Sequence, residues 1–161
     1  MSLSRCEEGR RPTEAAVRST ELKLSKKERA AHLDTLSNFV IAKRLQKHKQ
    51  FGGVYANDEL KRPEQGKIYI LNLENANEGG SHWTLLYSGW YFDPFGAPPT
   101  TKIQPFVEKY SADQFQKFSG ESCGYFTMFV AENIIRGDTP TKGLVPYEFA
   151  HNERVLKKYF I

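Results

Sequence analysis

The pattern of apolar and polar positions predicts a small sheet in the middle of the chain. Residues 67–73 (KIYILNL) form a short continuous apolar run, which is typical of a buried strand. Two further apolar runs, residues 82–87 (HWTLLY) and 90–93 (WYFD), are separated only by Ser88 and Gly89, a pair that favours a two-residue hairpin turn. The pattern therefore predicts a hairpin beside a buried strand.

Helical spacing precedes this sheet. Apolar residues recur at helical intervals in residues 24–48, and Ser25 and Glu28 have the spacing of a capping box. Ser37 is an alternative cap, which would divide the segment into two helices.

Helical spacing also follows the sheet. Residues 123–137 predict a helix that stops at Gly137, and residues 152–161 predict a closing helix capped by Asn152. A further helix is expected to begin near Pro105.

The remaining segments predict loops. Residues 50–66 and 74–81 carry glycine and proline turn signals, and residues 111–122 are expected to form a short strand and a loop. The order of elements predicts an α+β fold with a small central mixed sheet flanked by helices. We expect residues 1–20 to be a flexible lead and residues 21–161 to be one domain.

Length and composition agree with this architecture. The chain has 161 residues, of which 39% are hydrophobic and 26% charged, enough for one domain with a core. No apolar run approaches the roughly 18 residues of a membrane span, and the N-terminus lacks the apolar region of a secretory signal. These features predict an intracellular protein with no membrane partner.

The chain carries a net charge of +4 at pH 7. Much of the positive charge lies in the first half, where it favours a solvated helix face over weak, salt-sensitive binding to DNA. Both interpretations stay open.

The two cysteines, Cys6 and Cys123, fit a reducing compartment. A Cys6–Cys123 bridge is the less favoured alternative. The four histidines are scattered and no spacing typical of zinc ligands occurs, so we expect neither a metal nor a cofactor.

Cys123 stands at the start of the predicted helix 123–137. The positive end of a helix dipole favours the thiolate, and the N–H groups of the first turn can hold an anion. Gly124 would let a substrate chain approach closely. Alone, however, a cysteine in this position is more often a small buried apolar residue.

Three other residues make Cys123 a candidate nucleophile. In the predicted hairpin His82 and Asp93 come near each other, so that Asp93 can fix the imidazole tautomer and His82 can serve as general base. Gln116 can donate an N–H group to an oxyanion, and Gln114 is a rival on the same strand face. Each of the three also has an ordinary structural interpretation.

These residues carry a resemblance. The pair His82-Trp83, Asp93 within YFDPFG, Gln116 within DQFQ and the CGYF that begins at Cys123 stand in the order His, Asp, Gln, Cys. That order resembles the adenovirus-type maturation protease (adenain) and the SUMO-protease clan. With FGGVYANDEL and GGSHW, the chain is most similar to the adenain-like proteases of Polinton elements, virophages and other large DNA viruses, over roughly residues 33–135.

The resemblance implies an adenain-like fold and a role for each residue. The catalytic residues would be His82 as base, Asp93 as its orienter, Gln116 as oxyanion donor and Cys123 as nucleophile. The substrate-binding residues would be Gly79, Gly80, Trp83 and Gly124. Adenovirus has a glutamate where this chain has Asp93, which favours the transposon and virophage branch.

The function implied is that of a cysteine endopeptidase that cleaves capsid precursor polypeptides near small or Gly residues during virus maturation. It would work in the host cytoplasm or nucleus, in a virus factory or in the virion, with DNA or a short peptide as further partners. Two alternatives stay open: an isopeptidase of the same clan that removes a ubiquitin-like modifier, and a non-catalytic basic binding module on a degenerate protease fold.

Overall fold

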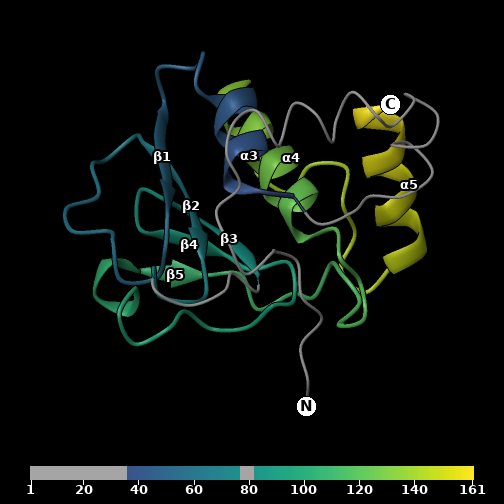
Figure 1. The fold of residues 1–161 in the computed structure, drawn as a ribbon. Helices are drawn as coiled ribbons and strands as arrows, with labels where there is room; N and C mark the ends of the chain where they lie inside the picture. Colours follow the sequence, from purple (N-terminus) through teal and green to yellow (C-terminus); the bar gives the residue numbers. More distant parts are fainter. Residues whose placement is uncertain (1–35, 77–81) are drawn as a thin grey trace.

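The computed structural model describes residues 36–76 and 82–161 (Figure 1). The expected lead at residues 1–20, the capping box of Ser25 and Glu28, and Gly79 and Gly80 all lie outside the described residues. No helix in the two described ranges is long and apolar enough to cross a membrane.

A five-stranded mixed sheet runs in chain order from one edge to the other. The outer pairs, β1 with β2 and β4 with β5, are parallel, whereas β2–β3 and β3–β4 are antiparallel. The strands are β1 (Phe51–Tyr55), β2 (Ile68–Asn72), β3 (Trp83–Tyr87), β4 (Trp90–Phe92) and β5 (Lys109–Tyr110). The sheet and the helices beside it confirm the α+β architecture with a central mixed sheet.

The predicted hairpin is confirmed. Tyr87 pairs with Trp90 across the two-residue turn. Ser88 and Gly89 have φ values of 46° and 80°, and two consecutive positive φ angles are the mark of a turn whose twist matches the strands.

Three helices of the described chain lie on one side of the sheet. In Figure 1, α3 (Asn38–Leu45) and α4 (Cys123–Ile135) stand between the sheet and α5 (Phe149–Phe160). The main core fills the space between the sheet and α4, with Ile70 and Leu85 from the strands and Phe126 and Val130 from the helix, all fully buried. Because α4 is apolar on nearly all sides, it becomes the central helix of the domain.

A second, smaller core covers the other face of the sheet. Leu71, Leu86 and Tyr91 point to that face, where Leu60 and Ile103 from the long connections cover them. One short turn of 3-10 helix, η1 (Gln104–Phe106), lies in the second of these connections.

Two expected helix boundaries are confirmed. Ser37 caps α3, because its hydroxyl oxygen accepts a hydrogen bond from the Val40 N–H at 3.3 Å. The second boundary is the end of α4, which stops at Ile135, and Gly137 follows with a φ of 78°.

The prediction of a loop over residues 50–66 is wrong at its start, where FGGVY forms β1. Glycine disfavours strands, but the apolar strand β2 offers an open edge for pairing, and β1 joins it with an irregularity between Phe51 and Gly53. Gly52 lies directly under the Tyr69 ring, and an added methyl group would come within 2.4 Å of that ring.

Three smaller predictions are also wrong. The segment near Pro105 forms only the single turn η1, and the short strand expected within residues 111–122 lies earlier, at β5, where it pairs with β4. Asn152 does not cap the closing helix, which begins at Phe149. Its side chain is fully buried and bonds other parts of the chain instead.

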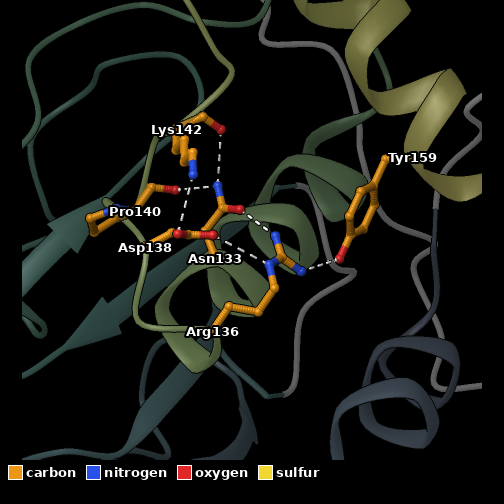
Figure 2. Close-up of polar contacts among 6 residues, drawn as sticks. All are labelled: Asn133, Arg136, Asp138, Pro140, Lys142 and Tyr159. Atoms are coloured by element: carbon orange, nitrogen blue, oxygen red, sulfur yellow. Dashed lines mark hydrogen bonds and ion pairs between the residues drawn. The ribbon is translucent and has the colours of Figure 1, made fainter.

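Polar contacts tie the end of α4 to α5 (Figure 2). Arg136 donates a hydrogen bond to the Tyr159 hydroxyl at 2.6 Å and another to the side chain of Asn133. Asn133 in turn donates to the carbonyls of Pro140 and Lys142, which closes the loop that leads to α5. The C-terminal half of α5 is therefore fixed on the central helix.

Candidate active site

The hairpin brings His82 and Asp93 into contact. Leu85 pairs with Phe92 and Leu86 with Tyr91, so the same register places Asp93 opposite Thr84, two residues after His82 and on the same face. His82 Nε2 lies 2.6 Å from Asp93 Oδ1, and both side chains are almost completely buried. A hydrogen bond to a carboxylate requires the proton on Nε2, which fixes the tautomer of the neutral ring.

The turn after Asp93 holds the carboxylate and the imidazole in place. The Phe95 N–H donates to the same Oδ1 at 2.7 Å, and the Gly96 N–H donates to the Asp93 carbonyl at 2.8 Å. The Phe95 ring stacks on the His82 ring with 4.1 Å between centroids and an angle of 3°. Sequence reasoning missed this role of Phe95, although its place in the Asp-Pro-Phe-Gly turn was a usable signal.

The negative charge of Asp93 contributes to a raised pKa of the neighbouring Tyr91. Burial raises the pKa of Tyr91 well above its ordinary value, and the charge of Asp93 adds to the rise, while a hydrogen bond with Thr84 opposes it. Tyr91 is therefore a neutral group at physiological pH.

Cys123 is the first residue of α4 and its side chain is fully buried. Its sulfur accepts a hydrogen bond from the Trp83 N–H at 3.5 Å. Because Trp83 directly follows His82, the sulfur lies against the backbone that carries the imidazole. The fold thus brings together residues 40 positions apart in the chain.

Cys123 is disulfide-bonded in this structure. The other cysteine of the sequence is Cys6, which lies outside the described residues. A disulfide sulfur is not a nucleophile, so any chemistry of Cys123 belongs to the reduced protein.

The start of α4 is not capped by the residue before it. Ser122, which is almost fully buried, makes no side-chain capping hydrogen bond. Its hydroxyl instead donates to the carboxylate of Glu153, on α5, at 2.6 Å. The Ser122 hydroxyl thus links the start of α4 to α5.

Gln116 lies on the segment beside the Asp93 turn. The N–H groups of Phe115 and Gln116 both donate to the Pro94 carbonyl, at 2.9 and 3.0 Å. The Gln116 side chain is buried, and a methyl group added at Gly120 would lie 3.1 Å from its Nε2. Its rival Gln114 is only half-buried and donates to the Gln116 carbonyl at 2.9 Å, and the role of either amide at an oxyanion stays a prediction.

Two residues expected to bind substrate pack inside the protein. The Trp83 indole is buried and donates to the Leu36 carbonyl at 2.9 Å. A methyl group at Gly124 would lie 3.0 Å from Leu36 Cβ and 3.2 Å from the Trp83 ring. In this structure both residues serve the contact between the segment before α3, β3 and α4, and their contact with substrate stays a prediction.

Within residues 36–76 and 82–161, no group of three or more His, Cys, Asp or Glu side chains is arranged to hold a metal ion.

Comparison of the sequence with models of protein families gives no match, and comparison with curated proteins gives none either. The case for a function therefore rests on the site and on the sequence motifs.

Proposed function

We propose that this protein is a cysteine endopeptidase in its reduced form, with an adenain-like fold. The proposal is carried by the buried His82–Asp93 pair, together with the hydrogen bond from the Trp83 N–H to the sulfur of Cys123, the first residue of the central helix. A base held in one tautomer beside a sulfur at a helix start is the arrangement that nucleophilic thiol catalysis needs.

The first half of the reaction forms a thioester. Asp93 engages Nε2, so Nδ1 is the nitrogen that takes the proton from the Cys123 thiol. The thiolate attacks the scissile carbonyl and its oxygen becomes negative, stabilised by the Cys123 N–H and the Gln116 amide. When the C–N bond breaks, the leaving amine takes the proton from Nδ1.

The second half releases the acid. His82 accepts a proton from water as the hydroxide adds to the thioester carbonyl, and the same oxyanion donors are used again. The C–S bond then breaks, the thiolate returns, and the product leaves as a carboxylic acid. No cofactor enters either half.

The substrate side of the proposal rests on the sequence motifs. The order His82, Asp93, Gln116, Cys123 resembles that of adenain-like proteases. This resemblance supports capsid precursor polypeptides as the substrates, with small or Gly residues at the cleavage site. The four side chains are no more than 1% exposed in this structure. A substrate therefore needs a movement that uncovers the sulfur.

The test is cleavage of fluorogenic peptides by the protein before and after reduction with a phosphine. We expect cleavage after Gly-containing capsid-type sequences by the reduced protein only, and loss of cleavage in Cys123→Ser. Cleavage of ubiquitin-like Gly-Gly tails alone would favour the isopeptidase. Turnover by the reduced Cys123→Ser variant at the wild-type rate would overturn the proposal.

A further inference from the structure

Two neighbouring residues of α5 reach the two segments that carry the proposed oxyanion donors. Asn152 is fully buried, and its amide donates to the Phe115 carbonyl at 3.0 Å, immediately before Gln116. Glu153 accepts the Ser122 hydroxyl at 2.6 Å, immediately before Cys123. Gln116 and Cys123 stand on different segments of the chain, and α5 is an element that holds both segments.

The same Asn152 side chain also fixes the loop before α5. It donates to the Val145 carbonyl and accepts from the Val145 N–H, both at 2.8 Å. The neighbouring Tyr147, which has a φ of 64°, donates its N–H to the Gln114 carbonyl at 2.7 Å. The segment with Gln114, Phe115 and Gln116 is therefore tied to α5 and its loop at two points.

The far end of α5 is anchored independently of the site. Tyr159 accepts from Arg136, and the Arg44 guanidinium lies 4.7 Å from the centre of the Phe160 ring while it also pairs with Glu132 on α4 (Figure 2 shows the Arg136 contact). A helix fixed at one end can hold residues at its other end in a defined position.

We propose that Asn152 and Glu153 are positioning residues that assemble the oxyanion hole. Asn152 sets the position of Gln116 through the Phe115 carbonyl. Glu153 holds Ser122, and with it the backbone that leads into Cys123, through the Ser122 hydroxyl. Neither residue touches substrate. This inference rests on the proposed function, because it concerns the transition state of that reaction.

Changes at Asn152 and Glu153 should affect stabilisation of the oxyanion but not formation of the thiolate, whereas a general structural defect would affect both. The His82–Asp93 pair is held by the hairpin and the turn after it, so formation of the thiolate is expected to survive changes at Asn152 and Glu153. Stabilisation of the oxyanion is expected to suffer, because loss of one oxyanion donor lowers kcat about 10²–10³-fold in other acyl-transfer enzymes. Misplacement of a donor should cost less than its removal.

The experiment compares Asn152→Ala, Glu153→Ala and Glu153→Gln with the wild type, all reduced and each corrected for its folded fraction. For the two alanine variants we expect kcat to fall about tenfold or more, with KM within about twofold. Binding of a peptide aldehyde, which forms a tetrahedral adduct, should weaken in proportion. Alkylation of Cys123 by iodoacetamide should stay within about twofold of the wild-type rate. Glu153→Gln keeps an acceptor for Ser122 and should restore most of kcat.

Two controls on the same helix complete the design. Arg154→Ala changes an exposed neighbour and should leave all three measurements unchanged. Leu156→Ala removes a fully buried side chain and should lower stability without changing kcat of the folded fraction. Should Asn152→Ala fail to fold, the comparison of Glu153→Ala with Glu153→Gln still tests the proposal.

The outcomes distinguish the two claims. A reduced wild type without peptidase activity overturns the proposed function and this inference together. An active wild type whose kcat and aldehyde affinity are unchanged in Glu153→Ala overturns this inference alone. Equal losses in alkylation, aldehyde binding and kcat would also overturn it, since they would indicate a general distortion of the site.

Discussion

At the scale of single residues, the site depends on an Asp93 oxygen that serves two donors. Oδ1 lies 2.6 Å from His82 Nε2 and accepts from the Phe95 N–H at 2.7 Å. The carboxylate therefore both orients the imidazole and shapes the turn that brings Phe95 over it. Asparagine offers the same oxygen without the charge.

The first prediction compares the roles of these residues. Cys123→Ala and His82→Ala should reduce peptidase activity to background. Asp93→Asn should retain activity at least about tenfold above Cys123→Ala, because an orienter contributes less than the nucleophile. Initial rates of peptide cleavage, with folding checked by circular dichroism, measure the difference. Activity of Asp93→Asn no higher than that of Cys123→Ala would contradict it.

A second prediction concerns the buried phenol of Tyr91, whose pKa is raised by burial and by Asp93. Below about pH 10, the ordinary tyrosine pKa, the phenol is neutral in both the folded and the unfolded chain, so its contribution to stability is complete. Above that pH the unfolded chain loses the proton more readily, and the free energy of unfolding falls by up to about 1.4 kcal/mol per pH unit.

Tyr91→Phe should therefore lose less stability than the wild type between pH 9 and pH 11 (about one to two units around the ordinary pKa). At neutral pH the variant should be less stable by about 1 kcal/mol, because the hydrogen bond with Thr84 is lost. Urea denaturation at several pH values measures both effects. Tyr110→Phe, at an exposed position, is the control, and equal slopes for Tyr91→Phe and the wild type would refute the prediction.

At the scale of elements, the sequence predicted the features that are determined by residues close together in the chain. The hairpin followed from Ser88-Gly89 between two apolar runs, and the contact of His82 with Asp93 followed from the hairpin. Strand β1 was missed because its glycines argue against a strand, and only the edge of β2 explains it. Asn152 was interpreted as a cap because its buried partner Phe115 is distant in the chain.

The turn after β4 gives the third prediction. Gly96 has a φ of 75°, and an added methyl group would lie 2.8 Å from the Ala112 carbonyl oxygen. Gly137 has nearly the same φ of 78°, but nothing in the described chain lies within 4 Å of its added methyl group. Gly96→Ala should cost about 3 kcal/mol or more, whereas Gly137→Ala should cost about 1–2 kcal/mol, the conformational part alone.

Urea denaturation of the two variants measures this difference in the free energy of unfolding. Because Gly96 follows Phe95 directly, Gly96→Ala should also lower peptidase activity of the folded fraction, and Gly137→Ala should not. Equal stabilities for the two variants would show that the backbone contact at Gly96 relaxes without cost.

At the scale of the whole molecule, the site lies where the hairpin, the segment before α4 and the start of α4 meet. Sequence reasoning named His82, Asp93, Gln116 and Cys123, because each stands at a turn or a helix start that local patterns mark. It did not find Ser122 or Glu153, since their contact joins segments that only the tertiary structure brings together. Nor did it favour the disulfide state of Cys123, because two cysteines alone do not indicate a disulfide framework.

The most direct test of the central claim is the pH dependence of Cys123 alkylation in the reduced protein. Iodoacetamide rates are measured between pH 5 and pH 9, around the ordinary thiol pKa of about 8.5, by mass spectrometry of the peptides that hold Cys6 and Cys123. If His82 activates the sulfur, Cys123 reacts faster than Cys6 near pH 6, and His82→Ala removes the difference. If instead Cys123 reacts no faster than Cys6 at that pH and its rate rises only toward the ordinary thiol pKa, with or without His82, the account is contradicted.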